Sequence, residues 1–185
     1  MNQIPSDPPL PTVAVRKINR FNYIGERQFF LVHSLDGLIE PLSPVTLQAA
    51  MGSLLEKISW EPQDYILGLD SGGIVPALAV SFLSGLPLRI ACKVNLEIAD
   101  KSYFIEPGSP NPKIFMYNLP EQGKAIIVDD EIRTGRTVEN CILALEQQKK
   151  GINSVIVPVE STRFDARQKI RERGYELISY VQHDF

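Results

Sequence analysis

Cysteine and histidine are scarce in this chain, which has two of each among its 185 residues. Cys92 and Cys141 each lie in an apolar stretch, which predicts buried free thiols and not a disulfide framework, and we assign neither a redox role. The sequence also lacks a His/Cys cluster with metal-ligand spacing, so we expect no metal-binding side chains. Free thiols suit a reducing compartment, and the expected localisation is therefore cytoplasmic.

Long apolar runs and an excess of positive charge are also missing. No segment approaches the roughly 18 apolar residues that a membrane span needs, and the polar, proline-rich residues 2–11 do not resemble a signal peptide. The formal net charge of −3 gives no electrostatic attraction for nucleic acids or anionic membranes. We therefore expect a protein that binds neither nucleic acid nor membrane, and whose residues 1–12 are disordered.

The remaining composition, 44% hydrophobic and 22% charged, is typical of an ordinary globular protein. No shift in composition divides the chain and no internal repeat is evident, so residues 1–185 are predicted to form a single domain. The absence of a Gly-x-x-x-x-Gly-Lys-Ser/Thr pattern argues against a P-loop kinase.

Short apolar runs alternate with segments of helical length. Helices are predicted at residues 44–58, where Ser43 is a suitable N-cap, and at 74–83, 137–149 and 163–173. Strands are predicted at residues 65–69, 88–94, 124–128, 154–159 and 176–181. This alternation predicts an α/β fold with a mostly parallel sheet covered by helices on both faces. Ligands of such sheets bind at the carboxyl ends of the strands.

The most informative segment is 125–137, an apolar strand that ends in adjacent carboxylates and turns through Thr-Gly-Arg-Thr into a helix. Backbone N–H groups of residues 134–137 would converge at the helix N-terminus, where the positive end of the helix dipole favours a phosphate. Asp129 and Asp130 cannot help to bind a phosphate, but they can accept hydrogen bonds from a ribose diol. The segment therefore predicts a sugar-phosphate site, and the alternative is an ordinary strand, turn and capped helix.

This segment resembles the motif with which type I phosphoribosyltransferases bind phosphoribosyl pyrophosphate (PRPP). The resemblance implies that Asp129 and Asp130 hold the ribose hydroxyls and that residues 133–137 wrap the 5-phosphate. The implied phosphate-binding residues are Arg133, Thr134, Gly135, Arg136 and Thr137. Arg136 stands where many members of the family have a second glycine.

A second glycine-bearing turn, at residues 70–73, follows the predicted strand 65–69. Glycines allow the backbone to approach an anion closely, although such a turn can equally be an ordinary connection. Its position before the PRPP motif resembles that of the family's pyrophosphate loop, which implies PRPP contacts from Asp70, Ser71, Gly72 and Gly73. Lys93, at the end of the next strand, resembles the basic residue that the family presents to pyrophosphate.

Residues 95–118 form a Pro- and Gly-rich stretch that is too long for an ordinary connection. Within it, Lys101-Ser102-Tyr103 and Glu106-Pro107-Gly108 resemble the flexible lid loop of purine phosphoribosyltransferases. The resemblance implies that Lys101 contacts PRPP and that Glu106 exchanges a proton with the base. The alternative is a mobile charged loop without a catalytic role.

The resemblance extends from about residue 30 to the C-terminus, where residues 157–161 and 164–169 are similar to adenine and xanthine phosphoribosyltransferases. Ser161 replaces the lysine of the xanthine type, which favours adenine, whereas residues 29–41 resemble the xanthine-type hood. His33, in that hood, could contact the base or be structural.

The resemblance as a whole implies a homodimeric purine phosphoribosyltransferase that uses Mg²⁺ and transfers ribose 5-phosphate from PRPP to a base, with adenine favoured. Two alternatives remain. One is a PRPP-binding regulatory protein of the same fold without transferase activity, and the other is a transferase for a 6-oxopurine or a pyrimidine such as orotate.

Overall fold

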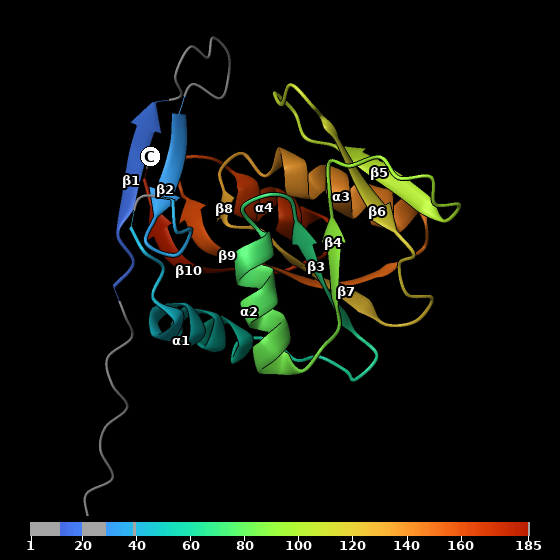
Figure 1. The fold of residues 1–185 in the computed structure, drawn as a ribbon, viewed down its shortest axis with the longest axis horizontal. Helices are drawn as coiled ribbons and strands as arrows, with labels where there is room; N and C mark the ends of the chain where they lie inside the picture. The colour runs from blue at the N-terminus through green and yellow to red at the C-terminus, as the bar shows by residue number, and fades with distance from the viewer. Residues whose placement is uncertain (1–11, 20–28, 39, 185) are drawn as a thin grey trace, which may run out of the picture.

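The computed structural model describes residues 12–19, 29–38 and 40–184. Its centre is a parallel sheet in the order β10-β9-β7-β3-β4, with the short strand β8 paired to β9 (Figure 1). These strands are β3 (Tyr65–Leu69), β4 (Leu88–Ala91), β7 (Lys124–Val128), β8 (Glu131–Ile132), β9 (Gly151–Ser161) and β10 (Leu177–His183). The predicted α/β fold with a mostly parallel sheet is confirmed.

The sheet is covered by helices α1 (Pro44–Leu55), α2 (Ile74–Ser84), α3 (Arg136–Gln147) and α4 (Ala166–Glu172). α1 begins as predicted, because the Ser43 hydroxyl accepts a hydrogen bond from the Thr46 N–H at 3.3 Å and Pro44 occupies the first helical position. α2 ends at Gly85, whose φ of 73° is the left-handed conformation that glycine adopts most readily. No helix of the described residues is long and apolar enough to cross a membrane.

Two hydrophobic cores lie on opposite faces of the sheet, because successive side chains of a strand point to opposite sides. Tyr65, Leu67 and Leu69 of β3 pack into the core that contains α3 and α4. Ile66, between them, packs into the core that contains α1 and α2. β7 alternates in the same way, so both central strands are buried on both faces. This explains why they were recognisable as unbroken apolar runs.

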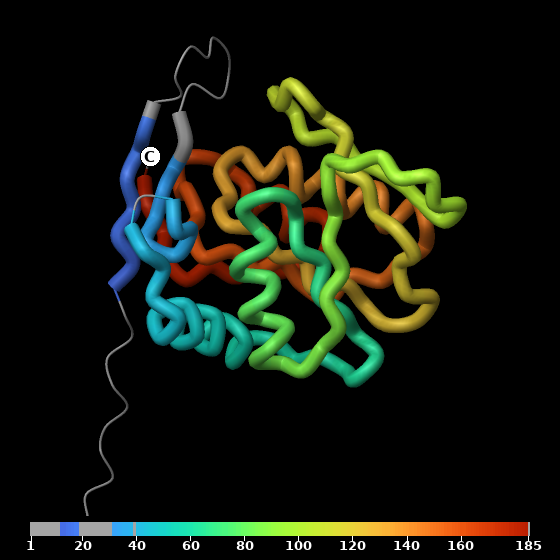
Figure 2. The backbone as a smooth tube through the Cα atoms, in the orientation of Figure 1, coloured from blue at the N-terminus to red at the C-terminus, as the bar shows by residue number. Residues whose placement is uncertain are grey.

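Two antiparallel hairpins flank the sheet (Figure 2). β1 (Val15–Asn19) pairs with β2 (Phe29–His33) and corresponds to the predicted hood. β5 (Lys101–Ile105) pairs with β6 (Lys113–Tyr117) and lies beside α3. The expectation for residues 1–12 falls almost entirely outside the described residues.

The β5–β6 hairpin corrects the sequence-based expectation of an irregular loop at residues 95–118. An antiparallel bridge between Cys92 and Phe115 joins the middle of β6 to the residue that follows β4. Phe104, Ile114 and Met116 bury their side chains in the core beside α3. The glycine and proline residues of the turn made the whole segment resemble a loop. The two strands form because their residues pair across the hairpin, and the sequence of either strand alone does not show this pairing.

Smaller differences concern boundaries. The predicted strand 88–94 ends at Ala91, the predicted helix 163–173 is reduced to α4, and β9 is longer than expected at both ends. β8, which has two residues, gives no recognisable pattern in the sequence.

Candidate functional site

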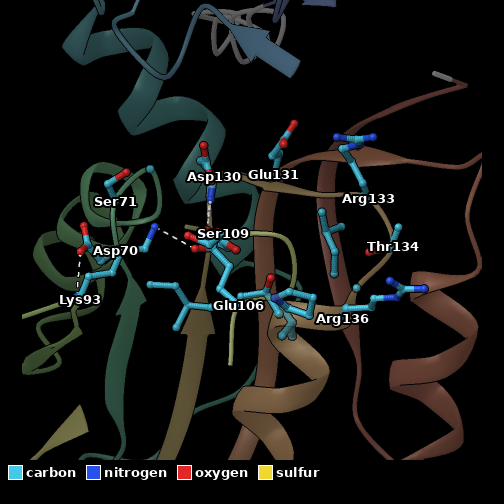
Figure 3. Close-up of a pocket in the computed structure, with 18 residues that line it drawn as sticks. Asp70, Ser71, Lys93, Glu106, Ser109, Asp130, Glu131, Arg133, Thr134 and Arg136 are labelled. Atoms are coloured by element: carbon cyan, nitrogen blue, oxygen red, sulfur yellow. Dashed lines mark hydrogen bonds and ion pairs between the residues drawn. The ribbon is translucent and has the colours of Figure 1, made fainter. Parts of the chain in front are cut away.

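A pocket at the carboxyl ends of β3 and β7 contains most of the residues predicted from the sequence (Figure 3). Its predicted members are Asp70, Ser71, Gly72, Lys93, Glu106, Asp129, Asp130, Arg133, Thr134, Gly135, Arg136 and Thr137. The polar lining residues that sequence reasoning missed are Ser109 and Glu131; the others it missed are Leu69, Pro107, Ile132 and Val138. Glu131 directly follows the acid pair and could have been found from that position, whereas Ser109 enters only because the hairpin turn folds over the pocket.

Lys101 lies away from this pocket. Its ammonium donates hydrogen bonds to the Asn95 side-chain oxygen and to the Leu96 carbonyl, both at 2.9 Å. Lys101 pairs with Tyr117 at the open end of the hairpin, and Glu106 lies at the turn. Five extended residues separate two groups by roughly 16 Å, so both cannot serve one small site. We therefore leave Lys101 out of the proposed site.

The glycines of the loop at residues 70–73 allow it to approach the end of β7. A Cβ atom on Gly73 would lie 2.7 Å from the carbonyl oxygens of Leu69 and Val128, and one on Gly72 would overlap the Asp130 carboxylate. The peptide bond between Asp70 and Ser71 is cis. Gly73 thus has a packing role and is not among the residues that line the pocket.

Asp129 and Asp130 lie side by side at the end of β7. The Asp129 N–H donates to the Ile156 carbonyl at 3.2 Å, and the Asp130 N–H donates to the Asp129 carboxylate at 3.0 Å. Burial, together with the neighbouring Asp130 carboxylate, raises the pKa of Asp129 well above its usual value. In Figure 3 Asp130 lies between Ser71 of the glycine loop and the arginines of the phosphate loop. The two acids are therefore placed to bind a polar group that joins two anions.

The phosphate loop, residues 133–137, leads into α3. Gly135 is the N-cap, has a φ of 74° and provides no capping side chain. A phosphate there would lie at the positive end of the helix dipole, close to Thr134 and Thr137. The Arg133 guanidinium lies 5.8 Å from the ring centroid of Phe164, within the range of a cation–π interaction. The loop therefore has the geometry of an anion site.

Lys93 and Glu106 form an ion pair across the pocket, with 2.8 Å between the ammonium and a carboxylate oxygen. The Glu106 side chain is 12% exposed and that of Lys93 is 30% exposed, so the carboxylate of this pair is the better shielded partner. The Glu106 N–H also donates to the Pro112 carbonyl at 2.6 Å, which closes the hairpin turn. On the other side, the Asn140 amide of α3 donates to the Ile105 carbonyl at 2.8 Å. The predicted proton-exchanging acid is thus held by the predicted pyrophosphate-binding lysine.

His33 and the cysteines lie outside the pocket lining. His33 is buried, and its Nδ1 accepts a hydrogen bond from the Leu35 N–H at 3.2 Å. Burial lowers the pKa of His33, and the nearby carboxylates of Asp130 and Asp36 oppose that shift. Both cysteines are free thiols, as predicted; Cys141 is also buried as predicted, whereas Cys92 is partly exposed and that part of the prediction is wrong.

Known proteins similar in sequence to this chain include purine phosphoribosyltransferases. A hypoxanthine/guanine phosphoribosyltransferase from Methanobrevibacter ruminantium is 25% identical over 162 residues, which cover 86% of this chain and 85% of that protein. An adenine phosphoribosyltransferase from Acetivibrio thermocellus is 26% identical over 144 residues, 76% of this chain and 83% of that protein. No protein-family model matches the chain.

Among solved structures, an adenine phosphoribosyltransferase from Trypanosoma brucei superimposes with a TM-score of 0.71 at 14% identity. The match covers 91% of this chain and 76% of that one, which was solved in complex with AMP, pyrophosphate and ribose 5-phosphate. This chain therefore has the fold of the type I phosphoribosyltransferases and is similar in sequence to members that act on purines.

Proposed function

We propose that the protein is a purine phosphoribosyltransferase, which transfers ribose 5-phosphate from PRPP to a ring nitrogen of the base. The observation that carries the proposal is that Asp129 and Asp130 line one pocket together with two loops suited to anions, residues 70–72 and 133–137. PRPP has the same order of groups, with a pyrophosphate, a ribose diol and a 5-phosphate. Hydrogen bonds from the diol to the carboxylates would orient the sugar, and the loops would bind its two ends.

In the proposed reaction the bond between ribose C1 and the pyrophosphate oxygen breaks, and the base nitrogen forms a new bond to C1. The bonding electrons leave with pyrophosphate, and positive charge develops on the sugar ring in the transition state. Lys93 and backbone N–H groups of the loop at residues 70–72 would stabilise the leaving charge. The base loses its nitrogen-bound proton, for which Glu106 is the proposed acceptor.

The ion pair of Lys93 and Glu106 implies an order in which PRPP and the base bind. Pyrophosphate would compete with the Glu106 carboxylate for the Lys93 ammonium, because its charge is higher. Once Lys93 binds pyrophosphate, the Glu106 carboxylate can turn toward the base and accept its proton. We therefore propose that PRPP binds before the base takes up its reactive position.

Mg²⁺ is the metal ion that we propose for the reaction. Asp70, Asp129 and Asp130 line the pocket, and carboxylate oxygens are ligands that this hard cation prefers. Among the described residues, however, no group of three or more His, Cys, Asp or Glu side chains forms a metal site. Most ligands would thus be pyrophosphate oxygens, ribose oxygens and waters. When bound, Mg²⁺ would neutralise part of the charge on the leaving group.

Adenine is the base that we favour. Ser161 is uncharged and stands where the xanthine type has a lysine, and Glu106 provides a carboxylate beside the pocket. A neutral aminopurine suits an acid better than xanthine does, because xanthine is partly anionic near neutral pH. The similar proteins include both adenine and hypoxanthine/guanine enzymes, so the 6-oxopurines must be compared directly.

The test is to measure kcat/KM for adenine, guanine, hypoxanthine, xanthine and orotate with PRPP and Mg²⁺. A preference for adenine would support the proposal in full. A preference for orotate would contradict the purine assignment, and a preference for xanthine would contradict the weight given to Ser161. PRPP binding without turnover of any base would instead support a regulatory protein.

We also propose a homodimer in the cytoplasm. α2 carries no charged residue, and its Leu78 and Phe82 side chains are 46% and 80% exposed. A helix that is apolar on all sides is normally buried, and this face carries no charge that would repel an identical face. Phe82→Glu should convert the dimer to a monomer in size-exclusion chromatography with light scattering. A wild-type protein that is monomeric would contradict the proposal.

A further inference from the structure

The start of α4 is in contact with the phosphate loop at two points. A Cβ atom on Gly135 would lie 3.0 Å from the Ala166 Cβ, so the loop backbone packs directly on α4. The ring of Phe164, just before α4, lies beneath the Arg133 guanidinium. Ala166 is completely buried by this packing. The position of the phosphate loop therefore depends on the position of residues 164–166.

α4 cannot fix that position alone. It has seven residues, and its N-cap residue Asp165 makes no side-chain capping hydrogen bond. Isolated helices of this length are unstable in water, so contacts with the sheet must hold it. Arg167, next to Ala166, provides such contacts.

Arg167 binds three groups on two strands. Its guanidinium donates a 2.9 Å bond from Nε to Glu160 and a second, shorter bond to the same carboxylate. It also donates to the Leu177 carbonyl at 2.6 Å and to the Ser179 hydroxyl at 2.9 Å. A planar guanidinium bound in this way has a fixed orientation. Arg167 thus ties the start of α4 to the ends of β9 and β10.

Glu160 connects the same strands to the other end of the loop. Its side chain is 4% exposed, and it also accepts hydrogen bonds from the Ser179 hydroxyl and the Gln182 amide. Burial alone would raise the pKa of Glu160, but the bonds from Arg167 and Ser179 outweigh burial and lower that pKa. In the backbone, Glu160 pairs with Ile132 of β8, one residue before Arg133. Glu160 is therefore linked to both sides of the phosphate loop, one through its backbone pairing with Ile132 and the other through the bonds of its carboxylate with Arg167.

We propose that Arg167 is a positioning residue for the phosphate of PRPP, acting through Ala166 and Phe164 on the phosphate loop. This inference rests on the proposed function. Arg167 is bound to Glu160, Ser179 and Leu177, and no step of the chemistry is assigned to it. Its role is to keep the donors of residues 133–137 where the phosphate binds, since displacements of about 1 Å in a site can cost 10²-fold in rate.

The first test is Arg167→Met, which keeps the length of the side chain and removes its hydrogen bonds. The KM for PRPP should rise at least about tenfold, with little change in kcat or in the KM for the base, because ground-state binding of the phosphate is lost. The matched control is Lys150→Met. Lys150 is also a partly buried cation that donates to backbone carbonyls, those of Leu119 and Pro120, but it lies before the amino end of β9. The control should have wild-type kinetics.

A second pair of variants tests the contact with Arg133. Phe164→Leu removes the ring and should raise the KM for PRPP about threefold or more, the scale of a lost cation–π contact. Phe164→Tyr keeps the ring and should restore the wild-type value. Equal KM values in both variants would contradict the role of Phe164.

A third measurement separates this inference from the proposed function. In the protein without ligand, hydrogen exchange at residues 133–137 should be faster in Arg167→Met than in wild type or Lys150→Met. If the wild type neither binds nor turns over PRPP, the proposed function fails, but the exchange comparison still tests positioning. Unchanged exchange in Arg167→Met would overturn the inference. If that variant does not fold, Ser179→Ala should show the same changes to a smaller extent.

Discussion

The two walls of the pocket are built differently. One wall is the end of β7 with the phosphate loop, supported by a sheet that is buried on both faces. The other is the turn of the β5–β6 hairpin, which faces the pocket through the ion pair of Glu106 with Lys93. The groups of the first wall are in place before a sugar phosphate binds, whereas Lys93 in the second can exchange Glu106 for the ligand. We therefore expect the sheet wall to bind the ligand and the hairpin to close over it.

The largest effect is expected when charge is removed from the sheet wall. Asp130→Asn should lower turnover at least about 10²-fold, because the ribose diol loses a charged acceptor that is in position before binding. The fold should not change, as judged by circular dichroism. Asp100→Asn, which alters an exposed acid, is the control. Near-normal turnover of Asp130→Asn would contradict the diol assignment.

The next effect concerns the phosphate itself. Thr137→Val should weaken PRPP binding about tenfold in calorimetry, because a hydroxyl donor is replaced by a methyl group at the anion site. The base should bind as before. Thr46→Val makes the same change in the first turn of α1 and should leave PRPP affinity unaltered. An unchanged affinity in Thr137→Val would mean that the phosphate binds elsewhere.

Substitutions in the hairpin wall should change the motion of the hairpin more than the affinity of the protein for PRPP. Glu106→Gln removes the charge that holds Lys93, so hydrogen exchange at residues 105–112 should become several-fold faster in the free protein. PRPP should slow exchange there in the wild type as the hairpin closes. Slow exchange throughout this turn in the free wild type would contradict its role as a lid.

The smallest predicted effect is on stability. Folding favours the neutral form of Asp129, because the pKa of its carboxyl is raised in the folded state. The stability that comes from the neutral carboxyl is fully present below about pH 4, the pKa of an unfolded Asp, and is lost as the pH rises through the raised pKa of the folded state. Asp129→Asn removes this loss and should raise the melting temperature at pH 7 more than at pH 5, while turnover falls. Equal melting temperatures of variant and wild type at both pH values would contradict the raised pKa of Asp129.

These two walls also differ in how far sequence predicts them. The sheet wall is a contiguous segment, in which strand, acids and loop follow one another, so its residues and their proximity could be inferred directly. The hairpin wall depends on pairing between residues 101–105 and 113–117, and nothing local fixes that register. Lys101 was assigned to the site because Lys101-Ser102-Tyr103 resembles the lid loop of the family, but the strand direction takes it to the far end of the hairpin. The contact of α4 with the phosphate loop is also long-range, and no motif indicated it.

The contact between Gly72 and Asp130 couples the glycine loop to the acid pair at the end of β7. The carboxylate fills the space that any side chain at residue 72 would need, so the loop and the acid pack against each other only with glycine there. A pyrophosphate group that binds the glycine loop would therefore hold Asp130 in place for the ribose diol of the same molecule. Pyrophosphate alone would gain little from this coupling, whereas a compound that carries both pyrophosphate and ribose would benefit twice. The protein would thereby discriminate between PRPP and free pyrophosphate.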